Sequence, residues 1–552
     1  MPGIATPQQV TATAILLAVY AVVILFFVVR GALKIKSMSD YAVGSVRFSP
    51  VAVGLSLAAS MTSAATFIIN PGFVAINGLS AMLSFGVIMP LASMISLVVF
   101  TKGFRKHGQT VRAHTLAQWI GSRFQSPGLT RYFGWLALLL ITFIVLICVG
   151  LTQVLSNALN APPLPVLVSV VVFIFGYMMF GGANSMVYTN TIQASLKLLV
   201  AIILLTSGYE HFSQGVHGFI AKLAAIDPAL THATNPGSYL FRDYFEIIFC
   251  QVVIGTAIVC QPHLITKSLL LDSEKDVNRY LLTAVAVLTV FFSVVFVGLY
   301  ARMAFPGLIL NGQELKMDKI MSAYVVREFP VYMGLLIILG LISAGISTLE
   351  SLIQSLSSTI TADIIKPLLP TTAFVGAGGF GREILLNRAV IAVLGGIAIW
   401  LSYDQFVNAK LSVAIFAQTG VYAYFAAAFV PISFGIFLKD APRSAVAWAS
   451  VTALLVHFGI YFGRLTPYMQ APVRNPGVSA ALGIVVSVVV GGVLYLARRR
   501  VGAAVPTIVV VVTPATTTEA SETVIERNPE RHAERSRSIS TATVIRAATT
   551  KQ

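Results

Sequence analysis

Polar side chains recur along one face of an apolar stretch near residues 331–362. They follow one another at the three- and four-residue spacing of a helix face, and they are Ser343, Ser347, Glu350, Ser351, Gln354 and Ser358. Thr348 flanks this stripe. Hydroxyl and carbonyl oxygens are hard ligands that suit a hard cation such as Na⁺. The stripe therefore indicates a cation site. The alternative is that the hydroxyls mediate packing between neighbouring helices.

A second polar surface precedes a Pro-Gly pair in the apolar stretch 49–77. Its hydroxyl residues are Ser56, Ser60, Thr62, Ser63 and Thr66, and Asn70-Pro71-Gly72 follows them. Proline removes a backbone donor and glycine loosens a helix, so the helix is expected to unwind there. Unwound backbone offers carbonyl groups to a cation and amide groups to an anion.

A similar interruption, Gln261-Pro262-His263, lies within the apolar stretch 244–269. Broken helices at matching positions of two halves are the best sequence indication of a central binding site. The two interrupted stretches would each open a five-helix unit. The alternative for each is a packing kink, which is common in membrane helices.

One basic residue stands in the middle of the apolar stretch 187–208. Lys197 shares a helix face with Asn190 and Gln193, which precede it by seven and four residues. At 1.5 Å per residue it lies roughly 15 Å from either end of the stretch, too far for its amine to reach water easily. Glu350 is the obvious opposite charge, so we expect these two residues to lie near each other or near water.

The composition determines the class of protein. Hydrophobic residues make up 57% of the chain and charged residues 11%, against roughly 25% charged in a soluble domain. The apolar residues form blocks of about 20, the length of a helix that crosses a bilayer. We predict an all-α integral membrane protein with about 13 transmembrane helices and a 5+5 inverted-repeat core, in which the second and seventh helices are broken. The expected spans are 11–33, 49–77, 80–101, 133–158, 163–180, 187–208, 244–269, 278–305, 331–362, 386–407, 411–438, 443–463 and 477–497.

The net charge of +16 is explained by loops between spans, so a nucleic-acid partner is not expected. Lys and Arg concentrate in alternate loops, which predicts an outside N-terminus and a cytoplasmic C-terminus in the cell (inner) membrane. The three cysteines suggest neither a disulfide framework nor a metal site, and no removable signal peptide is expected. We divide the chain into a first span with its loop (1–48), a transport core (49–440), accessory spans (441–500) and a disordered tail (501–552).

Four sequence pieces, in order and on the expected spans, resemble the sodium:solute symporter family. The pantothenate, proline and sialic-acid branches are the most similar in these sequence motifs, and members of the family share the leucine-transporter-type fold. The pieces are Ala59 to Phe67 with Pro71-Gly72; Gly181-Gly182 with Val187, Thr189 and Gln193; Gln261-Pro262-His263 with Lys267; and Ala344 to Thr348 with Ser357-Ser358 and Asp363.

The resemblance implies a main sodium site between the second and ninth spans, with Na⁺ as the coupling ion. Its backbone ligands would be Ala59, Thr62 and Ala344, and its hydroxyl ligands would be Ser347 and Thr348. The solute would bind beside the second-span break. The residues at matching or adjoining positions are Ser63, Thr66, Asn70, Gln261 and Gln418, although Gln261 could equally have a structural role.

The chain departs from the family pattern at a second possible site. Asn190 stands where the family commonly has Asp, and Glu350 and Ser351 occupy two positions whose hydroxyls serve a second sodium ion in some members. Lys197 replaces an apolar residue, often Met, and could act as a tethered cation. We group Asn190, Lys197, Glu350 and Ser351 as a second cation or ion-pair site.

These features favour Na⁺-coupled symport of a small organic solute by alternating access. The alternative is a proton-coupled or ion-independent transporter that uses Lys197 and Glu350 in place of the ion. A non-transporting membrane sensor or an intramembrane enzyme is disfavoured, since the sequence has no metalloprotease motif, phosphate loop or kinase tail. The fourth span lacks the arginine that binds a carboxylate in the sialic-acid branch. Small monocarboxylates, neutral amino acids and vitamins all stay open as solutes.

Overall fold

The computed structural model describes residues 6–35, 37–44, 48–111, 113–271, 273–310, 312–370, 379–408 and 412–504. Within these ranges the chain is helical apart from connecting loops and one short antiparallel pairing, β1 (Ile309–Leu310) with β2 (Gln313–Glu314). Helix α21 (Pro476–Ala504) includes the first four residues of the expected disordered tail. The rest of that tail lies outside the described residues.

Ten described helices are long and apolar enough to cross a membrane, as the composition predicts. They are Pro7–Ala32 (α1), Leu79–Gly108 (α5, η2 and most of α6, Met89–Val111), Pro127–Leu159 (α8, η3 and α9), Pro163–Thr206 (α10), Glu274–Ala304 (α14, η8 and α15), Val331–Leu368 (α17, η10 and η11), Gly381–Val407 (in α18, Gly379–Val407), Val413–Phe437 (α19), Arg443–Gly463 (α20) and Pro476–Arg499 (in α21). The second and seventh spans are bent pairs, which raises the count to twelve.

The expected number of about 13 spans is not confirmed, and the difference lies in α10. Its 44 residues cover both of the spans expected at 163–180 and 187–208. Gly182 interrupts it with a φ of 65°, a left-handed conformation that favours glycine. An ideal helix of this length would measure about 66 Å, roughly twice a bilayer core, so α10 has the length of two spans.

The second span is broken, but eight or so residues before the predicted place. Helix α3 (Pro50–Met61) is followed by Thr62, whose backbone is extended. The helix then resumes as η1 (Ala65–Ile69) and α4 (Asn70–Asn77), and the two parts of the span meet at an angle of 59°. Pro71 lies in the first turn of α4, where a missing amide costs little. A Cβ on Gly72 would come within 2.3 Å of the Met317 carbonyl oxygen, so this glycine permits close packing and does not unwind the helix.

The seventh span is broken where the sequence predicts. The η6–α12 segment (Phe245–Ile258) and the α13–η7 segment (Pro262–Leu270) meet at 57°. Gln261 has extended backbone, as the residue before a proline prefers, and Pro262 begins the next helix. Both broken spans therefore confirm the expected architecture.

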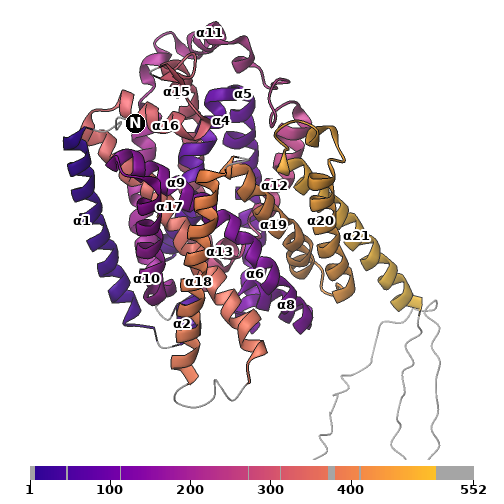
Figure 1. Cartoon of the computed structure of the whole chain (residues 1–552). Helices are drawn as coiled ribbons and strands as arrows, with labels where there is room; N and C mark the ends of the chain where they lie inside the picture. The colour runs from indigo at the N-terminus through magenta and orange to yellow at the C-terminus, as the bar shows by residue number, and fades with distance from the viewer. Residues whose placement is uncertain are drawn as a thin grey trace, which may run out of the picture. The chain divides into compact units, whose positions relative to one another are not determined.

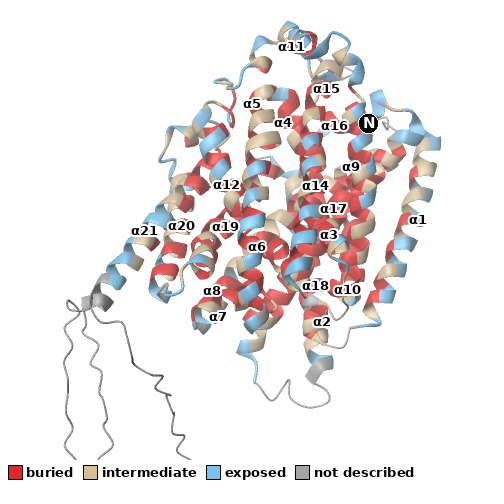
Figure 2. Cartoon of the chain, turned by 180° about the vertical axis from the view of Figure 1, so that it is seen from behind, coloured by how far each residue is buried: buried red, intermediate tan, exposed pale blue. Residues whose placement is uncertain are grey.

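Helices α3, α10 and α17 (Val331–Thr359) pack against one another in the interior. Figure 2 shows buried residues concentrated on α3 and α17, whereas α1 carries many exposed ones. Most exposed side chains of α1 are apolar, among them Ile15, Val22 and Phe26, as expected of a surface that faces lipid. In Figure 1, α11 (Gly215–Ile226) and α2 (Met38–Val43) lie at opposite ends of these helices.

The remaining described elements are short. They are α7 (Leu116–Arg123), η4 (Tyr209–Phe212), η5 (Pro228–Thr231), η9 (Met317–Lys319), α16 (Ile320–Glu328) and η13 (Pro467–Met469).

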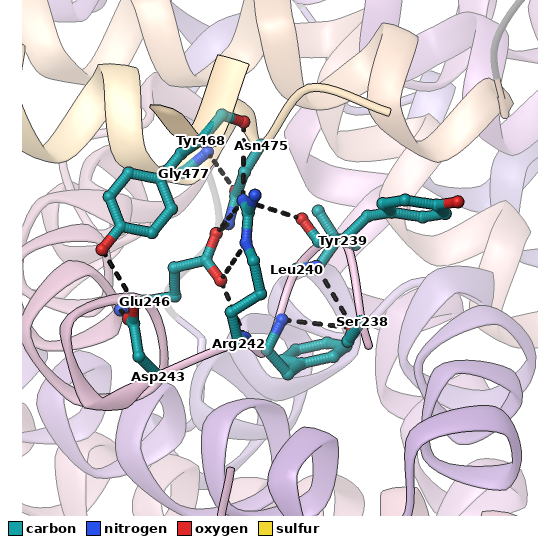
Figure 3. Close-up of polar contacts among 10 residues, drawn as sticks. Ser238, Tyr239, Leu240, Arg242, Asp243, Glu246, Tyr468, Asn475 and Gly477 are labelled. Carbon is teal, nitrogen blue, oxygen red and sulfur yellow. Dashed lines mark hydrogen bonds and ion pairs between the residues drawn. The ribbon is translucent and has the colours of Figure 1, made fainter. Parts of the chain in front are cut away.

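A polar network fixes the start of the broken seventh span (Figure 3). The fully buried Glu246 carboxylate accepts bonds from the Arg242 guanidinium at 2.5 and 3.0 Å and from the Asn475 amide at 2.8 Å. The Tyr468 hydroxyl donates to Asp243 at 2.7 Å. Bidentate arginine–carboxylate pairs are strong and directional. This network therefore holds the first half of the seventh span against the segment between α20 and α21.

Candidate cation site

The end of α3 and the middle of α17 are joined by hydroxyl-to-carbonyl hydrogen bonds. Ser347 Oγ donates to the Ala59 carbonyl at 2.9 Å. Thr348 Oγ1 donates to the carbonyls of Ser60 and Thr62 at 3.2 and 3.4 Å. These carbonyls are available because α3 stops at Met61, so no following helical turn claims them. The helix break thus creates the cluster of oxygen atoms that the sequence predicts.

The Lys197 ammonium group lies inside this cluster. Its Nζ donates to the carbonyl oxygens of Ala59 and Thr62, both at 2.8 Å. Longer contacts reach Thr62 Oγ1 at 3.2 Å and Ser347 Oγ at 3.3 Å. Three of the five predicted sodium ligands therefore surround the lysine nitrogen.

The other two predicted ligands belong to the same group of oxygens without touching the ammonium. The Ala344 carbonyl accepts from the hydroxyls of Ser347 and Thr348 at 3.2 and 3.3 Å. Hydrogen bonds therefore join all five predicted residues in one group. The group also holds the lysine side chain that sequence reasoning put at the second site instead. We name these five residues the main oxygen cluster.

Lys197 is fully buried. Its Nζ lies 5.1 Å from the ring centroid of Phe291 and 5.9 Å from that of Phe67, distances at which a cation is attracted to an aromatic face. No ion pair joins Lys197 to Glu350 in the described part of the chain, where the ion pairs include Arg242–Glu246 and Lys366–Glu383. Backbone oxygens, and not the expected carboxylate, solvate this ammonium.

Glu350 has separate partners. Tyr177 Oη donates to one carboxylate oxygen at 2.5 Å, and Thr189 Oγ1 donates to the other at 2.7 Å. Both donors are on α10, on opposite sides of the Gly182 interruption. Sequence reasoning missed Tyr177, because a lone tyrosine in an apolar span gives no signal that its hydroxyl meets a carboxylate.

Asn190 and Ser351 form a third group with two hydroxyls of α3. Asn190 Nδ2 lies 3.2 Å from the Oγ atoms of Ser56 and Ser60 and 3.3 Å from that of Ser351. The Oγ atoms of Ser60 and Ser351 are hydrogen-bonded at 2.6 Å, and Lys267 Nζ donates to Ser56 Oγ at 2.9 Å. The four residues grouped as a second site are thus divided among three places: Lys197 in the main oxygen cluster, Glu350 with Tyr177, and Asn190 with Ser351.

No side-chain hydrogen bond joins two of the predicted solute residues in the described structure, although the Thr66 amide donates to the Ser63 carbonyl at 3.0 Å. Ser63 Oγ accepts from the Ala65 amide at 3.1 Å and shapes the break. Gln261 donates to the Ile258 carbonyl at 3.1 Å, which is a structural contact at the seventh-span break. Thr66 is buried, and Asn70 and Gln418 are half-buried.

Two adjoining cavities share lining residues, and the narrower one lies beside the second-span break. The wider one has a volume of about 550 Å³, and the narrow one holds only about 10 Å³, the room of a single water molecule. The narrow cavity is lined at the break by Ala64, Ala65, Ile68 and Ile69, and Asn157 borders both cavities. None of the five predicted solute residues lines either one. A bond from Gln153 Nε2 to Asp318 Oδ2 at 2.9 Å links two residues of the narrow cavity wall.

Comparison with known proteins gives consistent relatives. Residues 41–452 match the model of the Sodium:solute symporter family. The sodium/pantothenate symporters of Escherichia coli and Haemophilus influenzae are 25% and 24% identical, over 60% and 61% of this chain and 67% and 68% of their own. A monocarboxylic acid transporter of Corynebacterium glutamicum is 20% identical over 83% of this chain and 87% of its own.

One similar solved structure is described as the substrate-bound outward-open state of a Na⁺-coupled sialic acid symporter with a novel Na⁺ site. It has a TM-score of 0.73 at 17% identity and covers 88% of this chain and 97% of that chain. The likeness shows the leucine-transporter-type fold that the two broken helices predict.

Proposed function

The chain belongs to the sodium:solute symporter family and is a Na⁺-coupled symporter of a small solute, and from this premise we propose where the sodium ion and the solute bind. It is a multi-pass membrane transporter and not an enzyme. We propose that Na⁺ binds the main oxygen cluster of Ala59, Thr62, Ala344, Ser347 and Thr348. The observation that carries this proposal is the hydrogen-bonded group that these oxygens form between the end of α3 and α17.

A cation in this cluster would tie the end of α3 to α17. In alternating access the broken helix and its partners move relative to the rest of the protein, and a ligand shifts the balance toward the state that it binds better. Sodium would favour the conformation in which Ala59 and Thr62 face Ser347 and Thr348. The solute would then bind at the adjacent break, and the same movement would release both on the other side.

We propose that the solute is a small organic molecule with one carboxylate. Two kinds of relative support this, since pantothenate is itself a carboxylate and the third relative is described as a monocarboxylic acid transporter. The geometry is compatible, because the helical segment Ala65–Asn77 begins at the narrow cavity. The start of a helix attracts negative charge through its dipole.

The test is uptake into proteoliposomes that contain the purified protein, with pantothenate and pyruvate as probe solutes. An inward sodium gradient is compared with an inward proton gradient at equal membrane potential. We expect the sodium gradient alone to accumulate at least one probe. Accumulation driven only by the proton gradient, or equal uptake without any gradient, would instead support the alternative in which Lys197 and Glu350 replace the ion. Thermal-shift screening of metabolites with and without sodium extends the test to other solutes.

The orientation in the membrane is a further part of the proposal. The excess of Lys and Arg in alternate loops supports an outside N-terminus and a cytoplasmic C-terminus in the bacterial inner membrane. The three native cysteines are buried, so one introduced at Ser213 reports on the loop after α10. We expect a membrane-impermeant maleimide to label it from outside in intact cells. Labelling only after the membrane is opened would reverse the orientation.

A further inference from the structure

The main oxygen cluster already holds a cation that belongs to the protein. The Lys197 ammonium makes its two shortest contacts, 2.8 Å each, with the carbonyls of Ala59 and Thr62. Both carbonyls are proposed sodium ligands. Two positive charges a few ångströms apart in a low-dielectric interior repel each other strongly. The cluster can therefore hold the ammonium or a sodium ion, but not both.

We propose that the Lys197 ammonium is an internal competitor of sodium, so that sodium binds only by displacing it. This inference rests on the proposed sodium site and adds how occupancy of that site is regulated. Because Lys197 is part of α10, the competitor is always present at a fixed effective concentration. Its strength therefore sets the sodium concentration at which the site fills.

The surroundings of Lys197 allow this exchange. Within the described ranges, the charged nitrogen has no carboxylate partner that would hold it in place. Its attachment is to neutral oxygens, and the faces of Phe291 and Phe67 lie beside it at 5.1 and 5.9 Å. An aromatic face can receive an ammonium that leaves its hydrogen-bond acceptors. The flexible four-carbon stem permits a short displacement without movement of the helix.

The two cations share some ligands but not others. Ser347 Oγ contacts the ammonium at 3.3 Å, whereas Thr348 Oγ1 bonds to carbonyls and makes no contact with it. Removal of the Thr348 hydroxyl therefore weakens sodium without weakening its competitor. A lysine that competes with sodium therefore predicts different effects for loss of the Thr348 hydroxyl and loss of the Ser347 hydroxyl. A lysine with a merely structural role does not.

The test is a sodium titration of the purified full chain in detergent, read as the rise in melting temperature, with choline chloride keeping ionic strength constant. Lys197→Met removes the charge and keeps an unbranched apolar stem. We expect its sodium midpoint to fall by about tenfold or more, because the tethered competitor is gone. Gln193→Leu, one turn earlier on α10, is the matched control and keeps the wild-type midpoint. Lys197→Gln carries the same expectation if the methionine variant does not purify.

An unchanged midpoint in Lys197→Met would overturn the inference, and so would a complete lack of response in both proteins. A response of Lys197→Met with none in the wild type would support the inference while contradicting sodium coupling of the natural protein. Sodium-driven uptake by the wild type with equal midpoints would do the reverse. The two proposals therefore fail on different results.

Discussion

The side-chain nitrogen of Lys197 lies 2.8 Å from the backbone oxygen of Ala59, at the point where α3 ends. The same oxygen accepts a bond from Ser347 on α17 at 2.9 Å. One carbonyl thus connects three helices, and in our proposal it is a ligand for either cation. This arrangement links the break in the second span to the charge on α10.

Thr348→Ala is expected to raise the sodium midpoint more than Ser347→Ala does. The Thr348 hydroxyl is a proposed sodium ligand that does not bond to the ammonium, whereas that of Ser347 also contacts the ammonium. A lost polar contact to a charge costs roughly 1.5–3 kcal/mol, so we expect a shift of about tenfold or more for Thr348→Ala. The measurement is the sodium titration of melting temperature. Ser343→Ala, on the same face of α17, should leave the midpoint unchanged, and unchanged midpoints in all three variants would remove the main oxygen cluster as the sodium site.

Tyr177→Phe is expected to lower the melting temperature. The phenol donates to the fully buried Glu350 carboxylate at 2.5 Å, and its loss leaves one carboxylate oxygen unsatisfied. We expect a cost of about 1–3 kcal/mol. Tyr132→Phe is the matched control, because that hydroxyl only accepts a 3.3 Å bond from Ser450. Equal melting temperatures for the two variants would mean that Glu350 does not depend on Tyr177.

Asn190→Asp is expected to add a second sodium site. The side chain faces the hydroxyls of Ser56, Ser60 and Ser351, and its Oδ1 is buried without a hydrogen-bond partner in the described structure. A carboxylate there would supply charge to a group of hard oxygen ligands. Equilibrium binding of radioactive sodium should rise by one ion per protein. Gln193→Glu places a carboxylate one turn away as a control, and an equal gain in both variants would contradict a specific site.

Asp318→Ala is expected to open the narrow cavity. Its carboxylate accepts from Gln153 at 2.9 Å across the cavity wall. With Ala65→Cys as the reporter in that cavity, a membrane-impermeant maleimide should react several times faster in the Asp318→Ala background. The buried native cysteines give little background labelling. Lys319→Ala, which changes the neighbouring lining residue, is the control. If Asp318→Ala reacts no faster than the parent, the contact does not restrict access.

The sequence predicts the helical class, because a 20-residue apolar block has one stable form in a bilayer. It also predicts both broken spans, from the proline in each. It misplaces the second-span break by several residues. Asn70-Pro71-Gly72 remains helical since Pro71 begins α4 and Gly72 meets the Met317 backbone. Local residue preferences cannot show that a glycine is there for packing, because the Met317 carbonyl is distant in sequence.

The main oxygen cluster follows from the motif, but its relation to Lys197 does not. Charge complementarity predicts a partnership with Glu350, whereas the structure gives Lys197 two backbone carbonyls and gives Glu350 two hydroxyls. Backbone oxygens are identical in every residue type, so no sequence pattern indicates which of them are left unpaired. Only the end of α3 at Met61 reveals them.

The most direct measurement is the binding of radioactive sodium to Lys197→Met and to the double variant Lys197→Met with Ser347→Ala. Without the competitor, Ser347 Oγ can contribute only to sodium. We expect saturable sodium binding in the single variant and an affinity lower by about tenfold or more in the double variant, as for one lost ligand of a charged group. Equal affinities would show that sodium binds elsewhere and that the oxygens around Lys197 are not its site.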